Sequence, residues 1–128
     1  MTSSRIMVVD DEAPIRDLFL KCFSRAGYSV YTAESAEQAI ALLPETDCSL
    51  FFLDLYLPDM NGIDLCRRIR QSCPLTICYA VTGFDVLYEL KECKEADFED
   101  YLVKPVSLAD LLAAARHAFA KIEAREAS

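Results

Sequence analysis

Short apolar runs alternate with helical apolar patterns along this chain. Runs of strand length lie at residues 5–9, 29–32, 50–53, 75–81 and 101–103. Strands that alternate with helices over a whole chain are typical of a parallel sheet covered on both faces. The pattern therefore predicts an α/β fold with five parallel strands.

Apolar residues at helical spacing predict the helices of the first half. The first helix covers residues 14–26, before Gly27, with an apolar stripe at Ile15, Leu18, Phe19, Cys22 and Phe23. Ser35 and Gln38 form a capping box that starts a second helix. Its apolar residues end at Leu43, and Pro44 predicts its end.

Three more helices are predicted in the second half, at residues 62–71, from 84 to about 93, and from Ser107 onward. The last helix presents one apolar face, made of Leu108, Leu111, Leu112, Ala115, Phe119 and Ile122. His117 falls nearly opposite Leu108 on the helical wheel, so we expect it to be solvated.

Length and charge narrow the class of protein. A chain of 128 residues predicts one domain, residues 1–128 with a core at about 5–122, and we see no linker or repeat. The net charge of −8 argues against direct nucleic-acid binding, which needs clustered Lys and Arg. A bound cation or a basic partner fits this charge better.

The sequence also suggests a compartment. No apolar stretch approaches the roughly 18 residues of a membrane span, and the first residues do not resemble a signal or transit peptide, so we expect no membrane contact and a cytoplasmic protein. The six cysteines contain no Cys-x-x-Cys pair and His117 is the only histidine. We interpret the cysteines as small buried apolar residues rather than as zinc ligands.

Polar side chains follow four of the five predicted strands. Asp10 and Asp11 follow the first strand, Asp54 the third, Thr82 the fourth and Lys104 the fifth. In an open parallel sheet, ligands bind outside the carboxyl ends of the strands. These five residues are therefore predicted to face one crevice.

Three carboxylates in one crevice need a counter-charge, because each close pair is repelled by roughly 4 kcal/mol at an effective dielectric constant of 20. A hard divalent cation with oxygen ligands, Mg²⁺, fits this need. Asp54 could then attack phosphorus as a nucleophile, with Lys104 neutralising charge and Thr82 donating a hydrogen bond. The predicted product is an aspartyl phosphate.

At these residues the chain resembles the receiver domains of two-component response regulators. The matching stretches are VVDDE at 8–12, LDLYLPDMNG at 53–62, VTG at 81–83 and DYLVKP at 100–105. The resemblance covers the chain from about residue 5 to about residue 122. It implies a flavodoxin-like (βα)5 fold with strand order 2-1-3-4-5.

The resemblance also implies a role for each site residue. Asp11, Asp54 and the main-chain carbonyl of Tyr56 would hold the Mg²⁺ directly, and Asp10 would act mainly through water. It further implies Thr82 and Lys104 as phosphoryl contacts, Tyr101 as a rotating aromatic switch, and a cis Lys104–Pro105 bond.

The implied function is a phosphorylation-activated signalling switch that changes the surface of helix four, strand five and helix five. The phosphoryl donor would be a histidine kinase or a phosphotransfer protein. The target would be a downstream protein or an output domain outside this chain, and a homodimer formed on phosphorylation stays open. Such a domain is not an enzyme beyond self-phosphorylation from small donors and autodephosphorylation.

Two alternatives remain from other classes. A degenerate receiver could act as an unphosphorylated docking module, although all five site residues are present. A hydrolase similar to the haloacid dehalogenase superfamily also uses an aspartate nucleophile and Mg²⁺, but its usual second aspartate is replaced here by Tyr56. A nucleotide-binding enzyme is disfavoured, because the chain has only three glycines and no glycine-rich phosphate loop.

Tyr56 and Phe84 each lie two residues beyond a site residue, Asp54 and Thr82. Both are large aromatic residues that offer no base to orient water. We hypothesise that they screen the acyl phosphate from water, so that the phosphoryl group is lost slowly. The alternative is that the rings only cover core residues.

Overall fold

The computed structural model describes residues 4–83 and 96–127, and its elements alternate as the sequence pattern predicts. They are β1 (Arg5–Val9), α1 (Ala13–Arg25), β2 (Ser29–Ala33), α2 (Ala36–Thr46), β3 (Leu50–Asp54), α3 (Gly62–Ser72), β4 (Ile77–Thr82), β5 (Asp100–Val103) and α5 (Leu108–Glu126). The helix predicted at 84 to about 93 lies outside the described residues.

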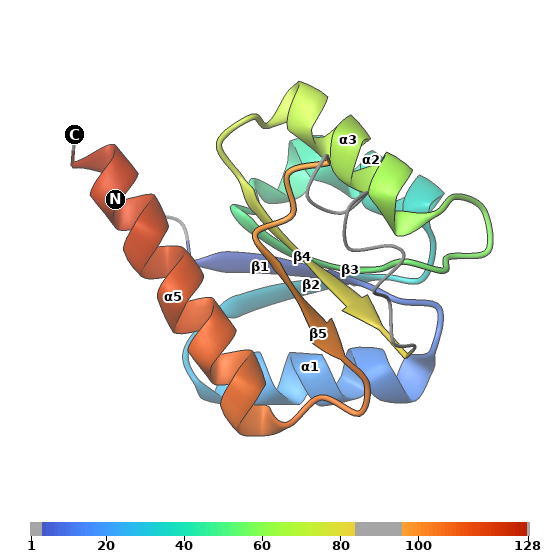
Figure 1. Ribbon diagram of the computed structural model, residues 1–128, viewed down its shortest axis with the longest axis horizontal. Coiled ribbons are helices and arrows are strands. Elements are labelled where there is room, and N and C mark those ends of the chain that lie inside the picture. The colour runs from blue at the N-terminus through green and yellow to red at the C-terminus, as the bar shows by residue number, and fades with distance from the viewer. Residues whose placement is uncertain (1–3, 84–95, 128) are drawn as a thin grey trace.

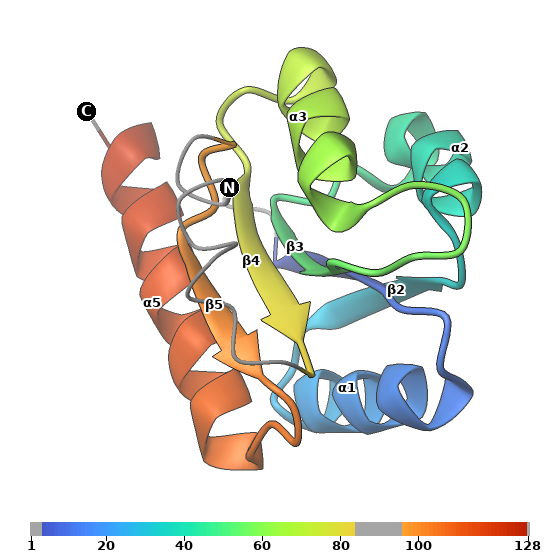
Figure 2. The same cartoon turned by 45° about the vertical axis from the view of Figure 1, so that its right-hand side comes forward.

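The five strands form one parallel sheet in the order β2-β1-β3-β4-β5, which confirms the predicted topology. Helices α1 and α5 cover one face of this sheet, and α2 and α3 cover the other (Figures 1 and 2). The sheet is therefore the middle of three layers.

The strands are apolar because the sheet is buried on both faces. Successive side chains of a strand point to opposite faces. In β1, Met7 and Val9 join the core beneath α2 and α3, whereas Ile6 and Val8 join the core beneath α1 and α5. All five residues of β3 are buried. The central strands thus hold the two cores together.

Two element boundaries differ clearly from the sequence prediction. Helix α2 continues through Pro44 and ends at Thr46. Proline is tolerated there because it lies close to the helix end and its missing N–H removes only one helical hydrogen bond. The Thr46 hydroxyl donates to the carbonyl of Leu42 at 2.9 Å. Strand β4 begins at Ile77 rather than at residue 75, since Leu75 lies in the preceding turn and is 73% exposed.

Two predicted core leucines are also exposed. Leu18 of α1 is 38% exposed, because the buried stripe of that helix is the narrower set Phe19, Cys22 and Phe23. Leu108 is 51% exposed, because it is the first residue of α5 and the buried stripe begins at Leu111. Both of these helices form where the sequence predicts them, but their predicted apolar faces were too wide.

Cysteines 22, 48, 66 and 78 are buried free thiols, as interpreted from the sequence, Cys73 is partly buried, and Cys93 lies outside the described residues. The side chain of His117 is 63% exposed, as expected. Within the described ranges, no helix combines the length and the apolar character that a membrane crossing needs.

Candidate functional site

The four strand ends that carry polar side chains meet at the carboxyl edge of the sheet. Asp54 is the last residue of β3 and pairs in register with Val81 of β4. Thr82 is the last residue of β4 and is fully buried. Asp10 and Lys104 directly follow β1 and β5, and the four strands lie in the order β1-β3-β4-β5, so their carboxyl ends follow one another along one edge of the sheet.

Lys104 is the cation at the centre of the site. Its Nζ lies 2.9 Å from Oδ2 of Asp10, 3.3 Å from Oε1 of Glu12 and 3.5 Å from Oδ2 of Asp54. The side chains of Asp10 and Asp54 are almost fully buried, and that of Lys104 is 14% exposed. Buried charges are costly unless they are paired, so this ion pairing helps to fix the site.

The three carboxylates that contact Lys104 and that of Asp11 form one acidic cluster. One ligand oxygen from each of Asp10, Asp11, Glu12 and Asp54 lies within 4.8 Å of the others. Among the described residues, Lys104 is the cation that pairs with these carboxylates, so the cluster keeps a negative excess. Opposite ligand oxygens of Mg²⁺ are about 4.2 Å apart, so these side chains need only small shifts to share such an ion. An all-oxygen donor set of this charge fits a hard divalent cation.

Backbone amides orient the two buried carboxylates. The N–H of Glu12 donates to Oδ1 of Asp10 at 2.9 Å, and the N–H of Tyr56 donates to Oδ1 of Asp54 at 3.0 Å. Each carboxylate bonds the backbone two residues on, as Asp often does in turns. The other oxygen of each, Oδ2, is left facing Lys104.

Burial and charge shift the pKa values at the site in opposite ways. Burial raises the pKa of Asp54 and the nearby charge of Asp10 adds to this, against the lowering hydrogen bond from Tyr56 and the charge of Lys104. Burial alone would lower the pKa of Lys104, but its hydrogen bond with Asp10 and the surrounding carboxylates raise it overall. The surroundings therefore disfavour the ionised form of Asp54 and favour the charged form of Lys104.

The remaining predicted site residues lie near this edge. Tyr56 follows β3 and is 48% exposed, and Tyr101 of the edge strand β5 is 37% exposed. The Lys104–Pro105 bond is cis, as the resemblance implied. Phe84 lies outside the described residues.

Three residues that support the site were not predicted from the sequence. Glu12 contacts Lys104, and a guanidinium nitrogen of Arg16 donates to the main-chain carbonyl of Asp10 at 2.8 Å. The acidic run at 10–12 was the available signal for Glu12. No local sequence pattern marks Asp59. Its carboxylate accepts hydrogen bonds from the backbone N–H groups of Ala36 and Glu37, which are more than 20 residues away.

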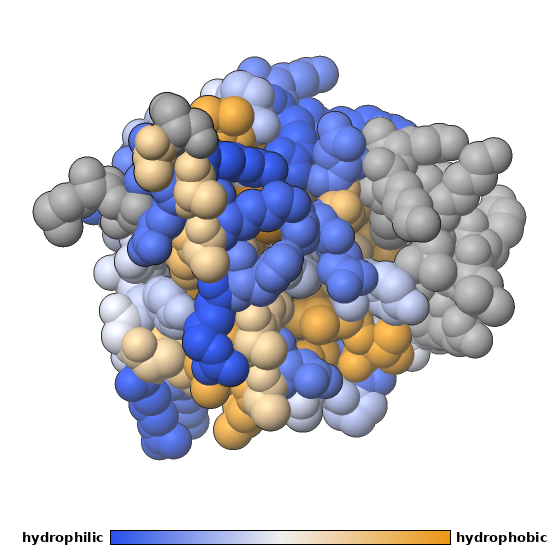
Figure 3. Space-filling view, turned by 60° about the vertical axis from the view of Figure 1, so that its left-hand side comes forward, coloured by the Kyte–Doolittle hydropathy of each residue, from blue (hydrophilic) through white to orange (hydrophobic). Residues whose placement is uncertain are grey.

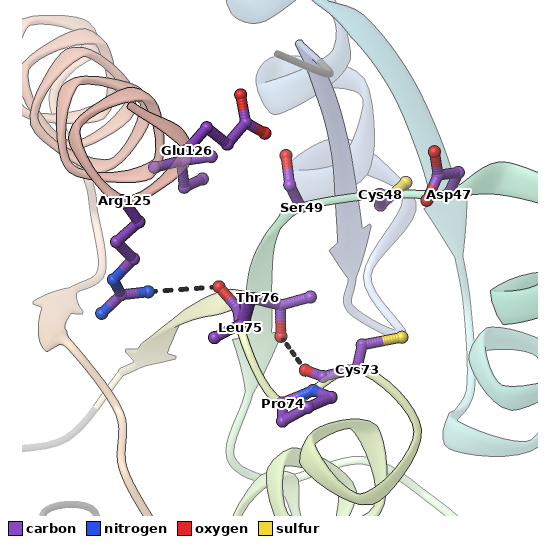
Figure 4. Close-up of a pocket in the computed structure, with 10 residues that line it drawn as sticks. Asp47, Cys48, Ser49, Cys73, Pro74, Leu75, Thr76, Arg125 and Glu126 are labelled. Carbon is purple, nitrogen blue, oxygen red and sulfur yellow. Dashed lines mark hydrogen bonds between the residues drawn. The ribbon is translucent and has the colours of Figure 1, made fainter. Parts of the chain in front are cut away.

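A separate cavity of about 420 Å³ lies at the opposite, amino-terminal end of the strands. It is bordered by the segments before β3 and β4 and by the end of α5 (Figure 4). Arg125 donates to the carbonyl of Leu75 at 3.1 Å across its mouth. None of the five predicted site residues lines this cavity, so it is not part of the acidic site.

Comparisons with known proteins agree with the geometry. The family model of the response regulator receiver domain matches residues 6–116. The alginate biosynthesis transcriptional regulatory protein AlgB of Pseudomonas aeruginosa is 41% identical over an alignment 128 positions long, which covers 95% of this chain and 28% of AlgB. The transcriptional regulatory protein ResD of Bacillus subtilis is 36% identical over 104 residues, 81% of this chain and 43% of ResD.

A solved structure of a CheY-like receiver domain protein from Methanospirillum hungatei superposes with a TM-score of 0.91 at 28% identity. The superposition covers 97% of this chain and 99% of that one. The chain therefore matches a whole receiver domain, whereas it spans less than half the length of the curated relatives AlgB and ResD.

Proposed function

Because the chain belongs to the response regulator receiver domain family, we propose that it is a signalling switch that accepts a phosphoryl group on Asp54 with the help of Mg²⁺. The whole chain, residues 1–128, would act as one receiver domain. The main support is the contact of the Lys104 ammonium with the buried carboxylate of Asp54, at 3.5 Å, inside a cluster of four carboxylates.

The carboxylates of Asp11 and Asp54 and the main-chain carbonyl of Tyr56 would hold the Mg²⁺, with Asp10 acting through water. The ion would neutralise negative charge on the transferring phosphoryl group. The oxygen-only donors and the negative excess of the cluster support this assignment.

Asp54 would act as the nucleophile. One of its carboxylate oxygens forms a bond to phosphorus, and the bond from phosphorus to the donor nitrogen breaks, so that the donor histidine leaves as a neutral imidazole after taking up a proton. Lys104, already beside Oδ2 of Asp54, is close enough to pair with phosphoryl oxygens. The Thr82 hydroxyl would donate a further hydrogen bond from the neighbouring strand.

The phosphoryl group would act on partners through Thr82 and Tyr101. It brings nearly two negative charges and new acceptor oxygens. Thr82 would move towards it and Tyr101 would rotate into the space vacated, which changes the surface of β5 and α5. Half-exposed apolar residues already lie there, Val103 and Leu108, and Figure 3 shows apolar side chains among hydrophilic ones on the side of α5. The part of this surface assigned to helix four lies outside the described residues.

We assign the donor to a histidine kinase or phosphotransfer protein of the cytoplasm and the target to a downstream protein, an output domain or a second phosphorylated copy. AlgB and ResD are named as transcriptional regulatory proteins and are longer than this chain, which supports an output of that kind. Catalysis by the chain itself would be limited to self-phosphorylation from small donors and to autodephosphorylation. The family match favours this function over the hydrolase.

Intact-mass measurement after incubation with acetyl phosphate tests the proposal. With Mg²⁺ we expect the mass of one added phosphoryl group, and with EDTA we expect none. The Asp54→Asn variant should gain no mass under either condition. No addition in the wild type would reject the assignment of Asp54 and favour the unphosphorylated docking module. An addition that survives Asp54→Asn would also reject the assignment, because another residue would then carry the phosphoryl group.

A further inference from the structure

Glu12 lies at the N-cap of helix α1, but its side chain pairs with Lys104 instead of capping the helix. It is the N-cap residue of α1 and makes no side-chain capping bond. Its main-chain carbonyl instead accepts the N–H groups of Ile15 and Arg16, both at 3.1 Å. The Glu12 carboxylate instead contacts Lys104, which is 92 residues away in the sequence, and its Oε1 lies 3.3 Å from Nζ of that lysine.

The three carboxylates that hold Lys104 are not equivalent. Asp10 and Asp54 are buried and belong to the group that would hold or surround the cation, whereas the side chain of Glu12 is 59% exposed. A divalent cation at the site would attract the carboxylates of Asp10 and Asp54 and so weaken their ion pairs with Lys104. It would also repel the ammonium of Lys104. Glu12 belongs to the same acidic cluster but is not among the residues assigned above to hold the ion, so in that arrangement its carboxylate stays available to Lys104.

Other cations do not compete for Glu12 in the part of the chain that the structure describes. The guanidinium of Arg16, one helical turn further, donates to the carbonyl of Asp10 and lies 4.0 Å from Glu34. The ion pair formed by Glu12 is with Lys104. Its carboxylate is therefore committed to the lysine.

We propose that Glu12 is a positioning residue that keeps the Lys104 ammonium at the phosphorylation site when a divalent cation engages Asp10 and Asp54. The inference rests on the proposed function, which supplies both the cation and the role of Lys104. A lysine held in this way is ready to pair with phosphoryl oxygens as they arrive. Without Glu12, cation binding would push Lys104 towards solvent.

The first readout is the exposure of Lys104 itself. Wild type and Glu12→Gln are treated briefly with an amine-acylating reagent, with and without Mg²⁺, and labelling of each lysine is measured by peptide mass spectrometry. Lys21 and Lys121, both exposed, serve as internal references. The Asp17→Asn variant removes one exposed charge from the same helix and controls for net charge.

Without Mg²⁺ we expect low labelling of Lys104 in wild type and in Glu12→Gln, since Asp10 and Asp54 still hold it. With Mg²⁺ we expect labelling to rise about twofold to fivefold in Glu12→Gln, the range for losing a partly exposed ion pair, and to stay low in wild type and Asp17→Asn. Phosphorylation of Asp54 by acetyl phosphate should slow by a similar factor in Glu12→Gln alone.

An equal response of Lys104 to Mg²⁺ in wild type and Glu12→Gln would overturn the inference, whether the labelling rises or not. The proposed function would survive that result if Asp54 still gains a phosphoryl group. Conversely, a selective rise of Lys104 labelling in Glu12→Gln without any phosphorylation of the wild type would support the positioning role and reject the proposed function.

Discussion

Gly62 at the start of α3 lies against the main-chain carbonyl of Asp54 with no room for a side chain between them. A Cβ at position 62 would overlap this carbonyl oxygen and would lie 2.9 Å from Cα of Leu55. The N–H of Gly62 also donates to the carbonyl of Leu55 at 2.9 Å. The first turn of α3 therefore fixes the strand end that presents the Asp54 carboxylate.

Gly62→Ala should destabilise the fold and impair phosphorylation together. The added methyl group meets backbone rather than a flexible side chain, so either α3 or the end of β3 must move. Such overpacking typically costs about 1–3 kcal/mol. Urea denaturation should show this loss. Gly83→Ala is the matched control, because a Cβ there meets no atom of the described residues within 4 Å, and it should cost less than about 1 kcal/mol.

Asp59→Ala should weaken the attachment of α2 to the loop after β3, and the effect should depend on pH. Hydrogen bonds from the N–H groups of Glu37 and Ala36 lower the pKa of Asp59 from its ordinary 3.8. A lowered folded pKa gives stability that is present above the unfolded pKa and lost as pH falls through the folded value.

Urea midpoints of wild type and Asp59→Ala should therefore differ at pH 7 and converge below about pH 4. Glu45→Ala, an exposed change near the other end of α2, is the control and should show no such convergence. A difference between wild type and Asp59→Ala that is constant from pH 7 to pH 3 would show that the charge of Asp59 is not involved.

Asp54→Asn should make the protein more stable at neutral pH when divalent cations are chelated. Burial and the charge of Asp10 raise the pKa of Asp54, so the folded state binds this proton more tightly than the unfolded state. Ionisation of Asp54 therefore lowers stability as pH rises above the unfolded value of 3.8, the cost is complete above the folded pKa, and it disappears again below 3.8.

Thermal melts in EDTA should thus place Asp54→Asn above wild type at pH 7, with the gap closing near pH 4. Added Mg²⁺ should stabilise wild type more than the variant, because a ligand that binds the folded state raises its stability. A wild type that is the more stable protein in EDTA at pH 7 would contradict this account of Asp54.

Tyr56 should slow the loss of the phosphoryl group. It is two residues beyond Asp54 and half exposed, where a ring can exclude water without supplying a base. The wild-type aspartyl phosphate should persist well beyond seconds without a phosphatase, and Tyr56→Ala should shorten its lifetime, as followed by intact mass after donor removal. Decay within seconds in the wild type would disprove the screening role. The same hypothesis for Phe84 concerns a residue outside the described ranges.

The five parallel strands and the meeting of the site residues were predictable because they follow from local patterns, whereas the strand order was implied only by the family resemblance. Apolar runs mark the strands, and each of Asp10, Asp54, Thr82 and Lys104 ends or follows one of them. Parallel strands bring such ends to one edge. The pairing of Lys104 with two buried carboxylates then follows from charge.

What the sequence could not give depends on contacts between distant segments. Asp59 reaches α2 across more than 20 residues, and Glu12 reaches Lys104 across 92, so neither contact leaves a periodic signal. Leu18 and Leu108 fit a helical stripe, yet they are exposed because the neighbouring layer does not extend over them. Such limits of an apolar face are set by packing rather than by spacing.

The identity of the phosphorylated residue tests the central claim most directly. Borohydride reduces an aspartyl phosphate to homoserine, so protein treated with acetyl phosphate and Mg²⁺ is reduced, digested and sequenced by mass spectrometry. We predict homoserine at position 54 and nowhere else, dependent on Mg²⁺. Homoserine at Asp10, Asp11 or another acidic residue, or a borohydride-resistant phosphate on a hydroxyl group, would contradict the account.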